Sequence, residues 1–187
     1  MALFDLPLDQ LETYRPEVPE PDDLDAFWRR PLDEARARPA LVDAVRVDTG
    51  LTLVETWDVT FAGHGGDPVK AWFSRPAGTD GTLLPAVVEY AGYGRGRGFP
   101  HERLTWVAAG YASLVMDTRG QGSQHGSGGG TPDPVGSGPA APGFVTRGID
   151  DPATYYYTRL ITDAVRAVDA VRELPGVDPA RVVAAGN

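Results

Sequence analysis

The sequence of 187 residues contains no cysteine. Disulfide bonds, thiolate catalysis and cysteine-ligated zinc sites are therefore excluded together, and the fold must be stabilised by packing. Long apolar runs are also missing: no stretch approaches the roughly 20 residues that a membrane-spanning helix needs, and we expect no membrane partner. Residues 1–6 have no basic region and no cleavage-site pattern, so we expect no secretory signal and a cytoplasmic location.

Positive charge is scarce as well. Lysine and arginine together number 17 against 26 acidic residues, and the net charge is −9. Such a surface repels nucleic-acid phosphates, and no basic patch interrupts it, so we expect no nucleic-acid partner. A hydrophobic fraction of 42% with 23% charged residues is typical of a globular domain. A neutral or cationic small molecule suits this charge better as a ligand.

The chain divides into an N-terminal arm, residues 1–45, and a main domain, residues 46–187. The arm is rich in proline and acidic residues and contains one helical stretch, near 24–32. The acidic pair Asp22 and Asp23 resembles a helix start at which a carboxylate caps free amides. Three aromatic residues favour an arm packed against the main domain over the alternative, a disordered tail: Tyr14, Phe27 and Trp28.

Two stretches of alternating apolar and polar residues predict an antiparallel hairpin, because a turn-forming glycine-rich segment separates them. The stretches are 53–61 and 69–73, with the turn at 63–67. Two later runs, 85–90 and 112–117, are almost continuously apolar, as expected of strands buried on both faces of a parallel sheet.

The segments between the later strands have helical patterns. Residues 102–109 can form the crossover helix between the two buried runs. A longer helix over 153–174 ends at Pro175-Gly176 and leads to a short buried strand at 181–187. We expect its apolar face to hold Leu160, Ala164, Val168, Val171 and Leu174, with Asp163, Arg166 and Asp169 toward the other side. This order predicts an α/β fold with a mostly parallel sheet and an antiparallel N-terminal hairpin.

Glycine and proline dominate residues 120–148, and we expect no core element there. Loops of this length are uncommon unless they serve a function or are disordered. The tyrosines at 155–157 open the following helix, and we expect them to pack in the core or at an interface.

The last strand leads into Gly186-Asn187, the first two letters of a G-x-S-x-G nucleophile elbow. In α/β hydrolases this strained turn between a strand and a helix presents a serine above the sheet. We therefore predict an α/β-hydrolase fold with its nucleophile immediately after Asn187 and the triad Asp and His further on, all absent from this chain. Truncation, backbone cleavage and a covalently modified serine are the alternative reasons for the missing residue.

A glycine-rich loop at residues 89–98 directly follows the first buried strand. Acyl transfer builds negative charge on the carbonyl oxygen of the substrate, and backbone amides of such a loop can be aimed at that charge. We assign the oxyanion-hole donor to the backbone N–H of Tyr93, which also contacts the substrate. A phosphate-cradling loop and a plain flexible turn are the alternatives, and the absence of a G-K-[ST] sequence counts against a nucleotide.

A polar segment follows the second buried strand, at a position where open α/β sheets bind ligands. We expect Asp117 to fix the turn and the planar donors of Arg119 to brace loops near the site. In this fold the catalytic base follows the serine, whereas all three histidines precede it. His64, His101 and His125 are therefore predicted to be surface or capping residues.

Five groups of residues stand in order along the whole chain. They are Phe4-Asp5-Leu6-Pro7-Leu8 with Tyr14-Arg15-Pro16, Gly92-Tyr93 with Arg97-Gly98-Phe99-Pro100-His101, Met116-Asp117-Thr118-Arg119-Gly120-Gln121-Gly122-Ser123, Pro142-Gly143-Phe144 with Thr146-Arg147-Gly148-Ile149, and Tyr155-Tyr156-Tyr157 before Asp163-Ala164-Val165-Arg166-Ala167-Val168. Together they resemble the acetyl xylan esterase / cephalosporin C deacetylase family, carbohydrate esterase family 7. Arg119, Gly120 and Gln121 match a signature of that family, so the resemblance implies that they support the site. The family usually has glycine where this chain has Asn187, and the loop at 124–130 is more glycine-rich than is typical.

The resemblance implies an intracellular serine esterase that needs neither metal nor cofactor. It would remove acetyl groups from acetylated xylo-oligosaccharides and from cephalosporin C by a Ser-His-Asp acyl-enzyme mechanism. It also implies a homohexamer whose active sites face an internal cavity. Two alternatives stay open: a peptidase of the related prolyl-oligopeptidase group, and a non-catalytic binding or assembly fragment.

Overall fold

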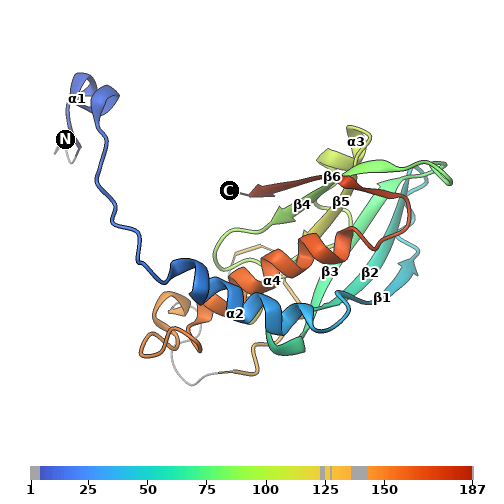
Figure 1. Ribbon diagram of the computed structural model, residues 1–187. Helices are drawn as coiled ribbons and strands as arrows, with labels where there is room; N and C mark the ends of the chain where they lie inside the picture. The colour runs from blue at the N-terminus through green and yellow to red at the C-terminus, as the bar shows by residue number, and fades with distance from the viewer. Residues whose placement is uncertain (1–4, 123–124, 127, 136–142, 187) are drawn as a thin grey trace.

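One six-stranded sheet forms the centre of the molecule (Figure 1). The structure, a computed structural model, describes residues 5–122, 125–126, 128–135 and 143–186. The strands lie in the order β1-β2-β3-β5-β4-β6. Their bounds are β1 (Leu41–Val47), β2 (Val54–Ala62), β3 (Pro68–Pro76), β4 (Leu84–Tyr90), β5 (Ala112–Met116) and β6 (Val177–Gly186).

The first three strands are antiparallel. Strands β2 and β3 pair without interruption from Val54 opposite Pro76 to Ala62 opposite Pro68, and the short 3₁₀ helix η1 (His64–Gly66) joins them. The predicted hairpin is thus confirmed. Strand β1 pairs antiparallel with β2 and was not expected from the sequence. The division of the chain between residues 45 and 46 falls inside β1 and stays a prediction.

The last three strands are parallel and form the other half of the sheet. Strand β4 pairs in parallel with β5 on one side and with β6 on the other, as the apolar runs predict. Strand β3 joins β5 in antiparallel orientation, so the described sheet is mixed, with three antiparallel and two parallel pairings. The α/β arrangement and the antiparallel hairpin are confirmed, and the parallel strands make up half of this sheet.

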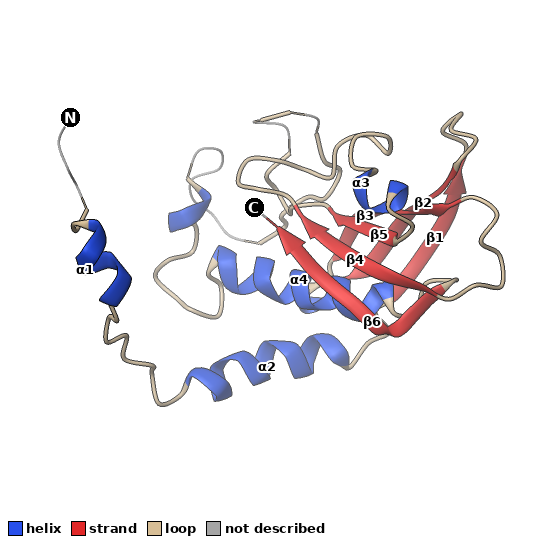
Figure 2. Cartoon of the chain, turned by 90° about the horizontal axis from the view of Figure 1, so that it is seen from above, coloured by secondary structure: helices blue, strands red, loops and turns tan. Residues whose placement is uncertain are grey.

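Helices cover both faces of the sheet (Figure 2). Helices α2 (Leu24–Arg36) and α4 (Tyr156–Val171) lie on one face, and α3 (Thr105–Ala108) lies on the other. Helix α3 is shorter than the predicted 102–109, since it begins only at Thr105, and Gly110 follows its C-cap with a φ of 91°. None of the helices in the described ranges is long and apolar enough to cross a membrane.

The core lies between the sheet and α4. Phe61, Phe73, Leu114 and Val171 are fully buried there, and burying each such side chain stabilises the fold by about 1.5–3 kcal/mol. The predicted apolar face of α4 is confirmed, since all five of its residues are buried or partly buried in this cluster: Leu160, Ala164, Val168, Val171 and Leu174.

The prediction that Asp163 and Arg166 face away from the core is wrong. The two residues are 0% and 2% exposed. Both side chains form hydrogen bonds with groups outside α4. Arg166 donates to the carbonyl oxygens of Ala62 at 3.1 Å and Arg38 at 2.8 Å. Buried charged side chains therefore attach α4 to the hairpin and to the segment after α2.

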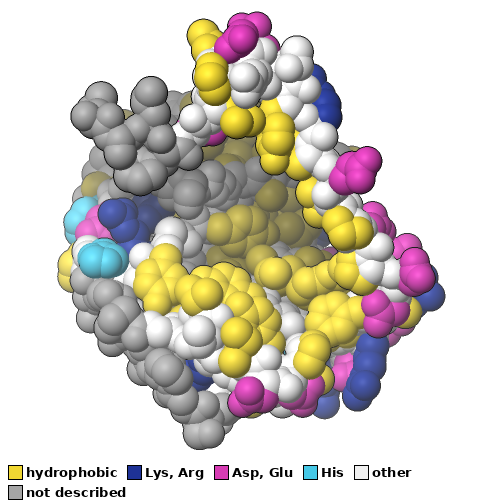
Figure 3. Space-filling model, turned by 90° about the vertical axis from the view of Figure 1, so that its left-hand side faces the viewer, with side chains coloured by type: hydrophobic (Ala, Val, Ile, Leu, Met, Phe, Trp, Pro, Cys, Tyr) yellow, Lys and Arg dark blue, Asp and Glu magenta, His cyan; other side chains and the backbone are white. Residues whose placement is uncertain are grey.

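The N-terminal arm is packed along only part of its length. Helix α2 contacts α4 and buries Ala35, whereas α1 (Leu8–Thr13) buries no residue. Asp23 occupies the predicted N-cap position of α2, but its side chain makes no capping hydrogen bond. From the side that carries α1, the surface is hollowed and hydrophobic side chains gather around the hollow (Figure 3). Large hydrophobic residues of the arm remain exposed, namely Leu6, Leu8, Leu11, Tyr14 and Val18.

Candidate active site

The loop after β4, residues 91–98, is held by side chains from the hairpin. The Trp72 indole nitrogen donates a 2.8 Å hydrogen bond to the carbonyl oxygen of Gly98. Arg97 stacks 3.8 Å above the Trp72 ring and donates to Asp58 at 2.8 Å. Burial raises the pKa of Asp58, but the hydrogen bond and charge of Arg97 outweigh it and hold that pKa below its usual value. The end of the loop is therefore fixed on β2 and β3.

Tyr93 lies in this loop, just beyond the carboxyl end of β4. Its hydroxyl accepts hydrogen bonds from the amides of Gly143 at 2.9 Å and Phe144 at 3.3 Å, and its ring contacts Phe144 edge to face. The side chain is thus anchored on the far loop. Within the described ranges, the Tyr93 amide donates no hydrogen bond. An oxyanion donor would need an amide that has no such internal acceptor.

Gln121 holds the same loop from a second direction. Its side-chain carbonyl oxygen accepts a hydrogen bond from the amide of Gly94, the residue after Tyr93. Its amide group donates to the Tyr156 hydroxyl at 2.9 Å, and that hydroxyl donates to the carbonyl oxygen of Arg119 at 2.6 Å. Burial raises the pKa of Tyr156, so the phenol keeps its proton in this chain of bonds.

Asp117 joins the candidate loop to the segment that follows β5. The fully buried carboxylate accepts hydrogen bonds from the amides of Arg97 at 2.9 Å, Gly130 at 2.7 Å and Thr131 at 2.8 Å. The Thr131 hydroxyl donates a fourth bond at 2.8 Å. Four donors satisfy the charge without a cation, and the expected role of Asp117 in fixing the turn is confirmed.

Close backbone packing around Asp117 requires glycine. A Cβ atom at Gly129 would lie 2.0 Å from an Asp117 carboxylate oxygen, and one at Gly96 would lie 2.5 Å from the Gly129 backbone. At Gly120, φ is 68° and a Cβ atom would lie 2.8 Å from the Cβ of Asp133. The glycines at these positions let three loops approach one another.

Arg119 lies at the centre of a buried charged cluster. Its guanidinium is fully buried and binds both carboxylate oxygens of Asp163, at 2.5 and 2.7 Å. It also donates to Asp67 in the hairpin at 3.0 Å and lies 3.5 Å from Asp133. Burial lowers the pKa of Arg119, but the bonds and charges of Asp163 and Asp67 raise it well above its usual value. Arg119 thus links α4, the hairpin and the long loop.

The sequence analysis missed Asp133, which extends this cluster. Its carboxylate contacts Arg119, Arg147 at 3.2 Å and Arg159, whose side chain is fully buried. Phe144 in the short 3₁₀ helix η2 (Phe144–Thr146) is also fully buried, so the expectation of no core element within 120–148 is wrong. Asp133 stands between two prolines, a pattern that predicts a turn but gives no sign of burial.

The three histidines lie in different segments, and one of them, His125, lies beside the Tyr93 loop, where its amide donates to the carbonyl oxygen of Gly94 at 2.9 Å. His64 is half-buried in η1, where its backbone amide donates to Asp163 at 2.8 Å. His101 and His125 are exposed, and His101 stacks on Phe99. In the described part of the chain, no group of three or more histidine and carboxylate side chains is arranged to hold a metal ion.

Strand β6 runs parallel to β4 and ends beside the carboxyl end of that strand. Gly186 pairs with Tyr90, three residues before Tyr93. Asn187, the second letter of the predicted elbow, lies outside the described residues. A residue that follows β6 would therefore emerge beside the loop that carries the Tyr93 amide, at the carboxyl ends of the parallel strands.

Comparison with known proteins identifies relatives of this chain. A sequence model of the family described as acetyl xylan esterase (AXE1) matches residues 1–187. The acetyl esterase Axe7A of Xylanibacter ruminicola is 26% identical over 182 residues, which cover 94% of this chain and 40% of that protein.

Two solved structures share the fold closely. The acetyl xylan esterase from Paenibacillus sp. R4 is 35% identical with a TM-score of 0.85, over 97% of this chain and 56% of that one. Acetyl xylan esterase 1 from Thermoanaerobacterium sp. JW/SL YS485 is 29% identical with a TM-score of 0.81, over 98% of this chain and 56% of that one. The chain spans about half the length of these relatives. Its α/β-hydrolase fold is shown, and the chain belongs to the acetyl xylan esterase family.

Proposed function

We propose that the full-length protein is a serine esterase that removes acetyl groups from acetylated xylo-oligosaccharides and from cephalosporin C. The observation that carries the proposal is the amide of Tyr93, which donates no hydrogen bond among the described residues and lies in a loop fixed at Gly94 and Gly98. The loop with this amide follows Tyr90, which pairs with Gly186 at the end of β6, and an elbow serine would follow β6. The family match supports the acetyl ester as the reacting group.

The reaction begins with the serine expected directly after Asn187. Its hydroxyl oxygen attacks the acetyl carbonyl carbon while the triad histidine, expected later in the full-length chain and oriented by an aspartate, takes the hydroxyl proton. The carbonyl oxygen becomes an oxyanion and accepts a hydrogen bond from the Tyr93 amide. Collapse of the intermediate returns the proton to the leaving sugar oxygen, and water then hydrolyses the acetyl-enzyme to acetate.

Arg119, Gly120 and Gln121 act as positioning residues in this scheme. Gln121 fixes the loop one residue after the oxyanion donor, and Arg119 fixes the segment that carries Gln121 to α4 and the hairpin. Gly120 provides the close approach between that segment and Asp133. We further propose a homohexamer in the cytoplasm, and sedimentation of the full-length protein tests the assembly.

Acetate release tests the proposed reaction. The purified full-length protein is incubated with acetylated xylobiose, cephalosporin C and p-nitrophenyl acetate, and acetate is quantified. We expect multiple turnovers on all three esters. Absence of acetate at micromolar enzyme would overturn the proposal, and cleavage of proline-containing peptides without deacetylation would identify a peptidase instead.

A further inference from the structure

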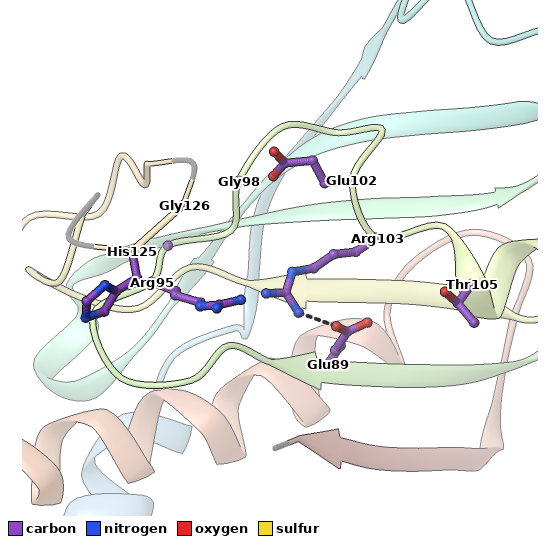
Figure 4. Close-up of a pocket in the computed structure, with 9 residues that line it drawn as sticks. Glu89, Arg95, Gly98, Glu102, Arg103, Thr105, His125 and Gly126 are labelled. Carbon is purple, nitrogen blue, oxygen red and sulfur yellow. Dashed lines mark hydrogen bonds and ion pairs between the residues drawn. The ribbon is translucent and has the colours of Figure 1, made fainter.

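A polar pocket opens beside the Tyr93 loop and has no part in the mechanism above (Figure 4). It has a volume of about 510 Å³ and lies between the loop after β4, the residues that precede α3 and the segment at 125–126. Charged side chains dominate its lining: Glu89, Arg95, Glu102, Arg103 and His125.

The pocket holds two carboxylates and two guanidinium groups, which are paired only in part among the described residues. Arg103 forms an ion pair with Glu89, and a carboxylate oxygen of Glu102 accepts the Phe99 amide at 3.0 Å. Within the described ranges, the Arg95 guanidinium has neither a hydrogen bond nor an ion pair. Arg95 and Arg103 point toward one another (Figure 4). The pocket therefore presents the Arg95 guanidinium, which has no bonded partner among the described residues, next to the ion pair of Arg103 with Glu89.

Backbone hydrogen bonds hold the described segments that line the pocket. The Gly98 amide donates to the carbonyl oxygen of Gly128 at 3.1 Å, and the His125 amide donates to that of Gly94 at 2.9 Å. The Arg97 amide is bound by the buried carboxylate of Asp117. Arg95 thus projects from a backbone that is fixed on both sides, which lowers the entropy that a ligand must overcome.

The pocket is also close to the proposed reaction centre. Arg95 follows Tyr93 by two residues, and Glu89 precedes Tyr90, the strand partner of Gly186. Tyr90 points to the α4 face, where its hydroxyl donates to the Ala164 carbonyl oxygen at 2.7 Å. Because side chains alternate along a strand, Glu89 points to the opposite face, toward Arg103. A substrate whose ester reaches the Tyr93 amide can therefore place a neighbouring group in the pocket.

We propose that this pocket is a carboxylate subsite, which selects acetyl esters that also carry a carboxylate group. The inference rests on the proposed esterase function for its substrate. A guanidinium presents a planar pair of donors that matches the two oxygens of a carboxylate. The net charge of −9 repels anions at long range, so an anionic substrate needs such a local cation. Uronate branches of acetylated xylo-oligosaccharides and the cephem carboxylate are the two sources of this group.

The test compares each carboxylate substrate with its neutral carboxamide in the full-length enzyme. The substrates are acetylated xylobiose with a glucuronate branch and cephalosporin C. In Arg95→Gln we expect KM for the carboxylate substrate to rise about tenfold at unchanged kcat. Both KM and kcat for the carboxamide substrate should stay as in the wild type. Arg30→Gln is the matched control, since Arg30 is exposed on α2 and forms an ion pair with the exposed Glu34. The substrate whose KM responds identifies the source.

An equal change in KM for the carboxylate and the carboxamide substrates, or no change in KM for either, would overturn the proposed subsite. A second measurement separates this outcome from failure of the esterase proposal. Calorimetry follows binding of glucuronate-bearing xylobiose without acetyl groups, which requires no chemistry. We expect its Kd to weaken about tenfold in Arg95→Gln, even if the protein releases no acetate. Equal affinity for the wild type and the variant would rule the subsite out.

Discussion

Gln121 accepts a hydrogen bond from the amide of Gly94 and thereby fixes the backbone one residue after the free amide of Tyr93. The two residues belong to loops that follow β5 and β4, so the bond joins the carboxyl ends of neighbouring parallel strands. Gln121 is in turn held by Tyr156 at the start of α4. The position of the proposed oxyanion donor thus depends on a glutamine that does not itself touch the reacting atoms.

Gln121→Met removes this acceptor while nearly conserving side-chain volume. We expect kcat for acetyl esters to fall about tenfold with little change in KM, because direct loss of an oxyanion donor costs about 100-fold or more and here the donor is only displaced. Steady-state kinetics of the full-length protein measure the effect. Gln10→Met, an exposed change in α1, is the control. A rise in KM at constant kcat would show that Gln121 acts on substrate binding instead.

Asp163→Leu leaves the buried guanidinium of Arg119 without its bidentate partner. We expect the free energy of unfolding to fall by about 3–5 kcal/mol, the usual cost of breaking a buried ion pair from one side. Urea denaturation of the full-length protein measures the loss. The exposed pair Arg30 with Glu34 provides the comparison, since Glu34→Gln should cost about 0.5 kcal/mol or less. Similar losses in both variants would refute a structural role of the buried pair.

Neighbouring glycines offer a matched pair of substitutions. Gly129→Ala places a Cβ atom 2.0 Å from the Asp117 carboxylate, whereas at Gly130 no atom lies within 4 Å of the added Cβ. We expect Gly129→Ala to lose about 1–3 kcal/mol of stability and to reduce esterase activity, because the Asp117 contacts must move. Gly130→Ala should leave both unchanged. Equal thermal stability of the two variants would contradict the packing described around Asp117.

His64 makes stability depend on pH. Burial lowers its pKa below the usual 6.5, and the charge of Arg119 acts in the same direction. The folded protein therefore keeps His64 neutral where the unfolded chain already binds a proton. Its stabilising contribution is complete above pH 6.5 and is lost as the pH falls from 6.5 toward the folded-state pKa.

Replacing His64 tests this dependence. Between about pH 7.5 and about pH 5.5, the free energy of unfolding should fall less steeply in His64→Gln than in the wild type. Chemical denaturation at several pH values provides the measurement. The exposed His101→Gln variant should follow the wild type. Parallel slopes for the wild type and His64→Gln would show that His64 is not held neutral by the fold.

Much of the fold could be predicted because its signals are local. The hairpin, the parallel strands and the apolar face of α4 all follow from periodicity within single segments. Strand β1 could not be found in this way. In the described sheet it is the edge strand beside β2, and its burial does not alternate: Leu41 and Ala44 pack against the core, whereas Val42 and Val45 are 61% and 53% exposed.

In the candidate site, too, the features with local signals could be predicted and those that depend on distant partners could not. The Tyr93 loop and the segment with Arg119 were predicted because glycine-rich sequences directly follow buried strands. The buried charges of Asp133, Asp163 and Arg159 were not, since their partners lie far away in sequence. Periodicity assigns a charged residue to the solvent unless a distant partner is known, and only the folded chain provides that partner.

Labelling with an organophosphate that phosphorylates activated serines tests the proposed mechanism most directly. The full-length protein is treated with the reagent, its loss of acetate release is followed, and the modified peptide is sequenced by mass spectrometry. We expect one phosphoryl group per chain, on a serine directly after Asn187, with activity lost in proportion to labelling. Full acetyl esterase activity in the labelled protein, or inactivation with the label on another residue, would contradict a nucleophile beside the Tyr93 amide.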